Sequence, residues 1–183
     1  HSSRYLEGAI LVYLKKIQVV APNKKSNRFI KGKTDKFIGA YVKEPKVGRH
    51  EWVYDLDVTS MYPSVIMSLN ISPEMKVGKV AGWDAEEFMK KVEKSYTVNI
   101  IGDKDVVLTN PELSSMLNGE RLSISSNGVL YRTDKAGLIP SLLNTWFNER
   151  VEYRKLAKKY SDGGDTKQYE YFNRRQHIQK IIL

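Results

Sequence analysis

Apolar and polar residues follow different patterns along the first third of the chain, and three segments can be distinguished. The apolar-rich residues 7–20 predict a helix or a pair of strands. Residues 21–36 are basic and rich in turn-forming residues, which indicates a loop or linker. Residues 37–45 then predict a short strand that ends at a proline turn.

A second strand is predicted over residues 52–58, where aromatic and aliphatic residues alternate with two aspartates. In a strand the large apolar side chains would share one face, and Asp55 and Asp57 would share the other. A turn over residues 59–62 leads to a helix that we expect to start at Pro63, because proline suits the first turn of a helix.

The middle of the chain carries the signals of a small α+β unit. The capping-box pattern of residues 84–87 predicts a short helix from Ala85 to Lys94. Strands are expected around two turns, one at residues 102–105 and the other at residues 126–128.

The last quarter of the chain has the period of a helix. Apolar residues recur at helical spacing from Leu138 to Tyr160, which predicts one long amphipathic helix. Residues 161–166 contain two consecutive glycines and predict a turn, and a second helix is expected from Lys167 to the end. Two such helices would form an antiparallel hairpin.

Composition narrows the classes of protein to be considered. The chain has 183 residues, of which 41% are hydrophobic, so it can form a packed core and is not disordered throughout. Without cysteine it has no disulfide framework, thiolate nucleophile or cysteine zinc site. The three histidines lack metal-ligand spacing, and no apolar run is long enough to predict a membrane span.

The charge is distributed unevenly along the chain. Residues 1–50 hold 12 basic and 3 acidic side chains, residues 51–140 hold 9 and 13, and residues 141–183 hold 9 and 5. Two basic segments therefore flank an acidic one, which suits a polyanion bound at the edges and a cation bound at the centre. The alternative is a basic surface that serves only solubility.

Asp57 is the first candidate for chemistry. A carboxylate at the end of a strand, followed at once by a turn, can offer a hard cation one side-chain oxygen and one backbone carbonyl. Asp55 is expected on the same face and would either share the cation or face water. The alternative for Asp57 is a solvated residue at a strand end.

Tyr62 lies just before the predicted helix and close in sequence to Asp57. The backbone N–H groups that lead into a helix N-terminus form a natural phosphate site, which favours a binding role. Burial of the ring in the core, with its hydroxyl hydrogen-bonded, is the alternative.

Basic residues on the predicted hairpin form the third candidate. Arg150 and Arg154 project from one face of the first helix, because they are four residues apart. Folding the hairpin at its glycine turn would bring Lys180 nearly level with Arg150, so that three cations could converge on one anionic ligand, such as a triphosphate. Alternatively, Arg150 extends past apolar neighbours to water or pairs with a glutamate.

One segment resembles a known family. Residues 57–64 read Asp-Val-Thr-Ser-Met-Tyr-Pro-Ser, which resembles motif A of the family B DNA polymerases, usually Asp-x-x-Ser-Leu-Tyr-Pro-Ser. Residues 39–45 and 70–74 resemble the T4-like phage branch of that family. The resemblance covers residues 37–74 and 126–183.

Further resemblances follow in the expected order. Residues 147–150, Phe-Asn-Glu-Arg, resemble the first fingers helix of the family. Residues 179–183 resemble the start of motif B, just before the expected Asn-Ser-x-Tyr-Gly.

By position, the resemblance implies that Asp57 binds a catalytic metal ion, with the backbone carbonyl of Val58 as a second ligand. It also implies that Ser60, Met61 and Tyr62 form the pocket for the incoming triphosphate and sugar. The ring of Tyr62 would fill the space that a ribose 2′-hydroxyl needs.

The remaining roles concern phosphate and template. Arg150 and Lys180 correspond to the fingers cations that bind the triphosphate, and Arg154 stands where relatives often have lysine. Gly39 and Ala40 resemble an element that contacts template DNA between the exonuclease and polymerase parts, although Phe37 replaces its usual tyrosine.

Several parts of the family pattern are missing from this sequence. It contains no Asp-Thr-Asp motif C, no complete motif B, no exonuclease carboxylates and no thumb, so it supplies only half of a two-Mg²⁺ site. We therefore expect the chain to be inactive alone and to need a complementary polypeptide that continues motif B. Residues 181–183 are apolar and lack a polar cap, which favours a helix that continues or docks there, at a gene split or an intein.

The predicted fold class is α+β: a partial polymerase palm with mixed or antiparallel strands and short helices, followed by an antiparallel helical hairpin. Its expected segments are a basic linker at 1–50, a partial palm with motif A at 51–138 and the fingers hairpin at 139–183.

The predicted function is that of a fragment of a DNA-directed DNA polymerase, which adds deoxynucleotides to a primer 3′ end by two-metal phosphoryl transfer. The expected partners are primer–template DNA and a deoxynucleoside triphosphate, with no membrane; a phage-encoded protein would act in the host cytoplasm. The alternatives are a non-catalytic nucleic-acid-binding module derived from a polymerase, and a structural protein that dimerises through the hairpin.

Overall fold

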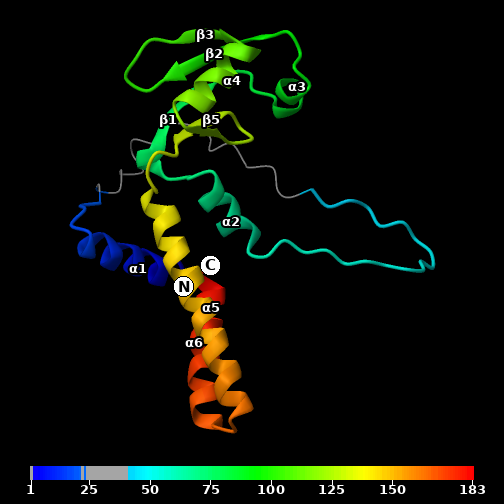
Figure 1. Ribbon diagram of the computed structural model, residues 1–183, viewed down its shortest axis with the longest axis vertical. Helices are drawn as coiled ribbons and strands as arrows, with labels where there is room; N and C mark the ends of the chain where they lie inside the picture. Colours follow the sequence, from blue (N-terminus) through cyan, green and yellow to red (C-terminus); the bar gives the residue numbers. More distant parts are fainter. Residues whose placement is uncertain (1, 22, 24–40) are drawn as a thin grey trace. The chain divides into compact units, whose positions relative to one another are not determined.

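The computed structural model describes residues 2–21, 23 and 41–183, which fall into two compact units, Ser3–Val58 and Thr59–Leu183 (Figure 1). In the first unit, helix α1 spans Ser2–Lys16, so of the two structures predicted for residues 7–20, a helix or a pair of strands, the helix is present. Its last turn holds Lys15 and Lys16, cations that suit the negative end of a helix.

Residues 41–58 contain no helix or strand, so the strand predicted over residues 52–58 is wrong (cyan in Figure 1). Trp52 has a left-handed backbone with φ of 58°, and Leu56 is 93% exposed. Alternation of side chains is not enough to form a strand, which also needs a neighbour for its backbone hydrogen bonds, and no described strand pairs with this segment. The described part of the strand predicted at residues 37–45 is also irregular, whereas the linker predicted at 21–36 lies almost entirely outside the described residues.

The second unit begins with helix α2, Met61–Ser68, which starts two residues before the predicted position and buries Pro63. The helix stops where Asn70 adopts a left-handed backbone with φ of 55°. A short 3-10 helix follows at Pro73–Met75.

A five-stranded antiparallel sheet forms the centre of the second unit, in the order β3-β2-β1-β5-β4. Its core consists of the fully buried side chains of Val80, Tyr96, Val98, Leu113 and Leu130. The strands flank the two predicted turns, which confirms both strand pairs. Their bounds are β1 Lys76–Val80, β2 Ser95–Ile100, β3 Val106–Thr109, β4 Leu122–Ile124 and β5 Val129–Arg132.

Two short helices accompany the sheet. Helix α3, Ala85–Met89, is shorter than predicted because Lys91 takes a left-handed backbone with φ of 54°. Helix α4, Asn110–Gly119, was not predicted. Its signal is present in the sequence: the carboxylate of Glu112 accepts hydrogen bonds from the N–H and the hydroxyl of Thr109, at 2.8 and 2.7 Å.

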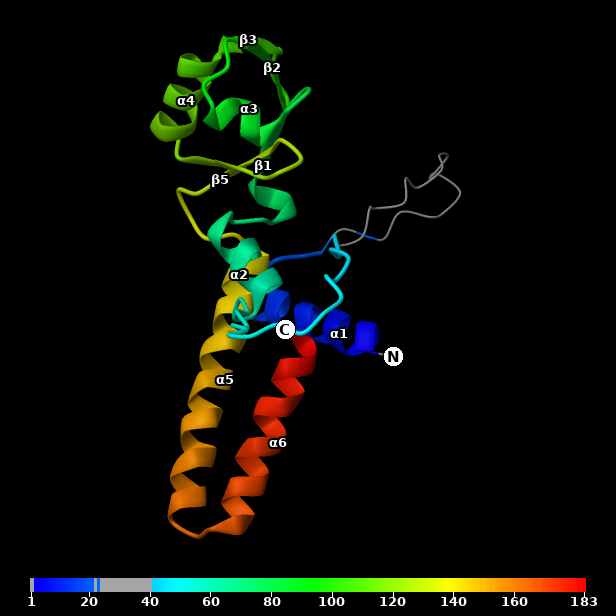
Figure 2. The ribbon, with the colours of Figure 1, turned by 90° about the vertical axis from the view of Figure 1, so that its right-hand side faces the viewer.

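The predicted helical hairpin is present (Figure 2). Helix α5 spans Leu138–Asp162, and helix α6 spans Thr166–Ile182 and packs against it. The helices meet through aromatic rings, among which Tyr160 and Phe172 stack with their centroids 5.5 Å apart. The fold is therefore α+β, as predicted. None of the helices in the described part of the chain is long and apolar enough to cross a membrane.

Candidate nucleotide-binding site

Asp57 and Val58 lie at the end of the irregular segment of the first unit, and both are exposed. A carboxylate and a carbonyl are the oxygen ligands that Mg²⁺ prefers, so the donors are of the right kind. They fill only part of an octahedral shell, and the described residues contain no cluster of three or more acidic or histidine side chains. The described part of the chain therefore does not form a complete metal site by itself.

Ser60, Met61 and Tyr62 lie where the chain enters α2, in the second unit. Ser60 precedes the helix with a left-handed backbone, φ 49° and ψ 53°, and its carbonyl accepts the N–H of Ser64 at 2.9 Å. Met61 and Tyr62 form the first turn of the helix and are 49% and 70% exposed. The ring of Tyr62 is therefore not packed in the core, and the alternative of a buried tyrosine does not describe this structure.

Arg150 and Lys180 lie at the same level of the hairpin, as the residue count predicted. Glu149 and Gln179, their neighbours in sequence, are joined by a hydrogen bond of 2.6 Å from Gln179 Nε2 to Glu149 Oε2. Arg150 is half-buried, and its Nε has no hydrogen-bond partner among the described residues. Lys180 is exposed, so both cations keep the capacity to bind an anion.

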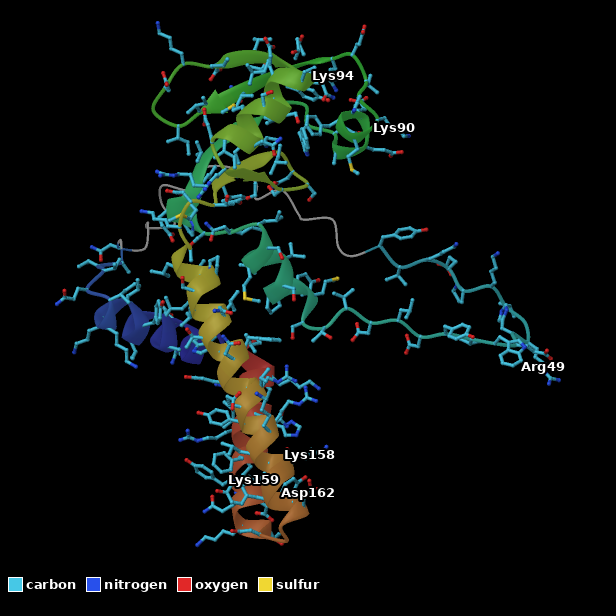
Figure 3. The ribbon with its side chains drawn as sticks, in the orientation of Figure 1. Arg49, Lys90, Lys94, Lys158, Lys159 and Asp162 are labelled. Atoms are coloured by element: carbon cyan, nitrogen blue, oxygen red, sulfur yellow. The ribbon has the colours of Figure 1, made fainter. Side chains whose placement is uncertain are left out.

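Arg154 lies one turn further along α5 and is exposed. Beyond it, Lys158, Lys159 and Asp162 project from the end of α5 near the turn of the hairpin (Figure 3). Closer to the middle, Arg175 of α6 lies over the rings of Tyr153 and Tyr171, 5.6 and 5.0 Å from their centroids. The contact with Tyr153 joins α6 to α5 at this level of the hairpin.

The sequence analysis missed the residues that join α2 to α5. Asn70 Oδ1 accepts the N–H of Gly137 at 2.8 Å, while Asn70 Nδ2 donates to the carbonyls of Arg132 and Lys135 at 2.5 and 2.9 Å. Glu74 Oε1 accepts the N–H of Leu138 at 2.6 Å. The polar residues Asn70 and Glu74, which closely follow α2, were the only signal of this contact in the sequence. Their partners lie more than 60 residues away, so the sequence could not indicate which residues they would bind.

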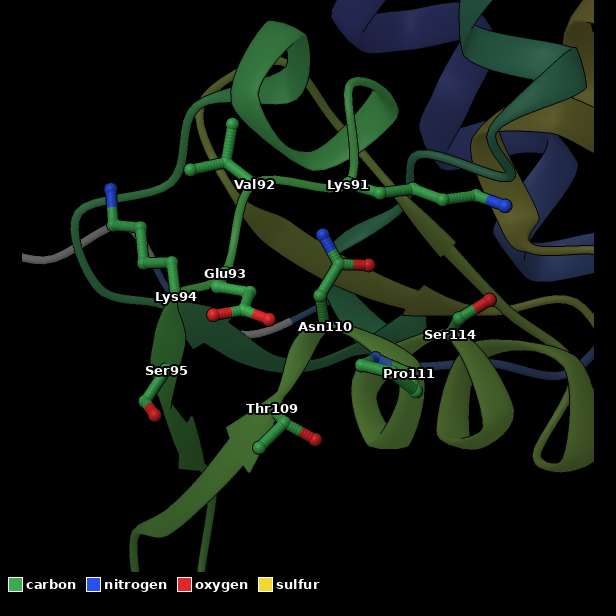
Figure 4. Close-up of a pocket in the computed structure, with 9 residues that line it drawn as sticks. All are labelled: Lys91, Val92, Glu93, Lys94, Ser95, Thr109, Asn110, Pro111 and Ser114. Carbon is green, nitrogen blue, oxygen red and sulfur yellow. The ribbon is translucent and has the colours of Figure 1, made fainter.

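A cavity of about 920 Å³ lies between the start of β2 and the N-terminus of α4 (Figure 4). None of the predicted site residues is among those that line it. One of its two lysines, Lys94, already pairs with Glu87 at 2.6 Å. The predicted DNA-contacting residues Gly39 and Ala40 lie outside the described residues.

By its fold the chain is an α+β protein that carries a long helical hairpin. A family model described as DNA polymerase family B matches residues 2–183, so the chain belongs to DNA polymerase family B.

Similar curated proteins agree with this membership. A DNA-directed DNA polymerase of Escherichia phage RB69 is 29% identical over 116 residues, which make up 63% of this chain and 10% of that protein. DNA polymerases of Desulfurococcus sp. (strain Tok) and Thermococcus gorgonarius are 29% and 28% identical over 163 residues, 89% of this chain. The chain spans 16% of the length of each of these two relatives.

Proposed function

We propose that the chain is part of a DNA-directed DNA polymerase that extends a primer 3′ end with deoxynucleotides. The observation that carries this proposal is the arrangement of the candidate residues in the second unit. An exposed Tyr62 opens α2, which packs against α5, and the cations Arg150 and Lys180 stand level on the hairpin that α5 begins.

In this proposal, Arg150 and Lys180 hold the phosphates of the incoming nucleotide and stabilise the pyrophosphate as it leaves. Arg154 adds a planar guanidinium one turn away, a group that suits phosphate oxygens. Ser60 and Met61 line the space for the triphosphate, while the ring of Tyr62 excludes a 2′-hydroxyl from the space beside the sugar.

Asp57 and the carbonyl of Val58 would hold Mg²⁺, which neutralises the triphosphate and activates the primer hydroxyl when it is bound. These two donors fill only part of the shell that Mg²⁺ requires, and in this proposal the remaining carboxylate ligands come from polypeptide outside this sequence. We therefore propose a complementary segment that carries the rest of motif B, motif C and the thumb. The described sheet and α2 would then belong to the palm, and the hairpin of α5 and α6 would be the fingers.

The proposal is tested by primer extension with the complete polymerase that contains this segment. Asp57→Ala should abolish incorporation and leave thermal stability almost unchanged, because Asp57 is exposed and is not part of the core. Asp103→Ala is the matched control, since it removes an equally exposed carboxylate from the turn between β2 and β3.

Near wild-type incorporation by the Asp57 variant would refute the proposed metal ligand. A wild-type protein that binds primer–template DNA but incorporates no nucleotide would instead favour the alternative of a non-catalytic nucleic-acid-binding module.

A further inference from the structure

The N-terminus of α5 is capped by side chains from a distant part of the chain. Gly137, Leu138 and Ile139 present three successive backbone N–H groups, which a helix cannot satisfy internally. They donate to Asn70 Oδ1 at 2.8 Å, Glu74 Oε1 at 2.6 Å and Ser72 Oγ at 3.3 Å. We call Asn70, Ser72 and Glu74 the polar clamp.

Two members of the polar clamp are almost completely buried, since Asn70 is 6% exposed and Ser72 is 1% exposed. Buried polar groups persist only when they are hydrogen-bonded, and these are. Asn70 uses its amide fully: its oxygen accepts from Gly137, and its nitrogen donates to the carbonyls of Arg132 and Lys135. Of the common helix-capping side chains, Asn alone can donate two hydrogen bonds while it accepts another.

The helix end and the polar clamp also match in charge and in shape. Glu74 places a carboxylate at the positive end of the α5 macrodipole, and the Ser72 hydroxyl holds that carboxylate at 2.8 Å. Gly137 fits against the clamp because it has no side chain. A Cβ atom there would lie 2.8 Å from the Cβ of Ser72 and 2.9 Å from the Cγ of Met75.

The polar clamp lies where a small change in the direction of α5 would move the candidate site residues on that helix. It follows α2, whose first turn carries Tyr62, and it holds the base of α5, whose middle carries Arg150. Arg150 is 13 residues from Gly137, about 20 Å along the helix at 1.5 Å per residue. A tilt of about 10° at the base would therefore move Arg150 by about 3 Å. Displacements of about 1 Å can reduce the rate of a reaction about a hundredfold.

We propose that Asn70, Ser72 and Glu74 are positioning residues that fix the triphosphate-binding cations of α5 relative to the sugar-binding end of α2. This inference rests on the proposed polymerase function. The clamp contacts no substrate; it acts through Arg150 by setting where the helix points.

The test uses the complete polymerase and a double-mutant cycle. Asn70→Asp keeps the acceptor for Gly137 but cannot donate to Arg132 and Lys135. We expect it to raise the KM for the deoxynucleoside triphosphate by about tenfold, the equivalent of about 1.4 kcal/mol. The affinity for primer–template DNA should change by less than about twofold, because the clamp is not expected to act on the DNA.

Arg150→Ala distinguishes a positioning role from a general loss of stability. If the clamp acts through Arg150, adding Asn70→Asp to Arg150→Ala should raise the KM by less than about twofold more, because the group being positioned is already gone. Asp84→Asn is the matched control. It weakens the N-cap of α3, where Asp84 accepts from Glu86 and Glu87 at 2.8 and 3.1 Å, and should leave the KM unchanged.

Full additivity of the Asn70 and Arg150 effects, or an equal KM change in the Asp84 variant, would overturn the inference. Should Asn70→Asp fail to fold, Ser72→Ala enters the same cycle, since it removes the acceptor for Ile139 and the donor to Glu74 and leaves a side chain of nearly the same size. These outcomes test the positioning role only if the wild-type enzyme extends primers. If the wild-type enzyme does not extend primers, the proposed function itself is refuted.

Discussion

At the scale of single residues, Tyr62 is the most informative side chain of the proposed site. It is 70% exposed at the start of α2, so its ring contributes little to the core of the described unit. A large, exposed ring can exclude a ligand group by its bulk alone. The proposed role therefore depends on the size of the side chain and not on its hydroxyl.

Tyr62→Ala should raise the use of ribonucleotides by the complete polymerase, without a comparable gain for deoxynucleotides, because it opens space beside the sugar. The ratio of kcat/KM for the two nucleotide classes measures this effect. Tyr62→Phe is the control, since it keeps the ring and removes the hydroxyl. A Phe variant that loses as much discrimination as the Ala variant would show that a hydrogen bond, and not bulk, is responsible.

The sequence predicted how the two helices of the hairpin align better than it predicted the contacts at the base of α5. Residue spacing placed Arg150 and Lys180 at one level, and the Glu149–Gln179 hydrogen bond confirms that level. Residue spacing could not predict the contacts of Asn70, because its partners lie 62, 65 and 67 positions further along the chain. Nothing local in the sequence specifies which distant helix end a buried amide will meet.

At the scale of elements, helices were easier to predict than strands. The period of α5 comes from the burial of one face of that helix, so the sequence carries it locally. The alternation in residues 52–58 indicates that the two faces of the segment differ in polarity. A strand also needs a neighbouring strand for its backbone hydrogen bonds, and the alternation carries no information about that neighbour. Helix α4 was overlooked although Thr109 and Glu112 form its capping box.

The close contact between Gly137 and the polar clamp predicts the effect of a single methyl group. Gly137→Ala should lower the free energy of unfolding by about 1–3 kcal/mol, because the added atom meets Ser72 and Met75 at less than 3.0 Å. Chemical denaturation measures this change. Gly119→Ala is the control: a Cβ there has no neighbour within 4 Å, so stability should stay the same or rise by up to about 1 kcal/mol. Equal effects in both variants would contradict the packing argument.

Three helix N-termini in the second unit depend on carboxylates whose pKa values are lowered. Burial raises the pKa of Glu74, but hydrogen bonds from Leu138, from its own N–H and from Ser72 outweigh it, and the net shift is downward from 4.5. Backbone hydrogen bonds from Glu87 and Glu86 lower the pKa of Asp84 from 3.8. The N–H and hydroxyl of Thr109 lower the pKa of Glu112 from 4.5.

A carboxylate whose pKa is lower in the folded state stabilises the protein fully above its unfolded pKa, and this stabilisation is lost as the pH falls through the folded pKa. The melting temperature should therefore fall as the pH drops below about 4.5 and 3.8, the ordinary values of these groups. A variant with Glu74→Gln, Asp84→Asn and Glu112→Gln should be less stable at pH 7 and show a flatter decline. A decline as steep as that of the wild type would mean that other groups cause it.

At the scale of the whole molecule, the net charge of +9 is the dominant electrostatic feature. In the described residues, some of the lysines that contribute to this net charge are paired with acidic side chains and others are not. Lys90 and Lys94 are paired with Glu86 and Glu87, both at 2.6 Å, whereas no described acidic group pairs with Lys158 or Lys159 (Figure 3). The hairpin therefore presents cations that are available to a polyanion.

DNA binding by the chain should depend strongly on salt, because each neutralised phosphate contributes a slope of about −0.9 in log K against log salt concentration. Lys158→Ala with Lys159→Ala should reduce the slope by about 2 if both lysines meet phosphates. Lys90→Ala with Lys94→Ala removes the same charge from paired positions and should change the slope less. Fluorescence anisotropy over a salt series gives both values, and identical slopes in the two variants would exclude the hairpin as a DNA contact.

The hydrogen bond between Asn70 and Gly137 also affects which changes in the length of the intervening segment the second unit can accommodate. The chain leaves α2 at Asn70, builds the whole five-stranded sheet, and returns to the same side chain 67 residues later. Because the two ends of the segment between Asn70 and Gly137 meet, the length of that segment does not affect the distance between α2 and α5. Insertions or deletions in its loops should therefore be tolerated as long as Asn70 keeps its contacts with Arg132, Lys135 and Gly137. The loops of the sheet are thus the places in the second unit where length should vary most easily, provided that Arg132 at the end of β5 still reaches Asn70.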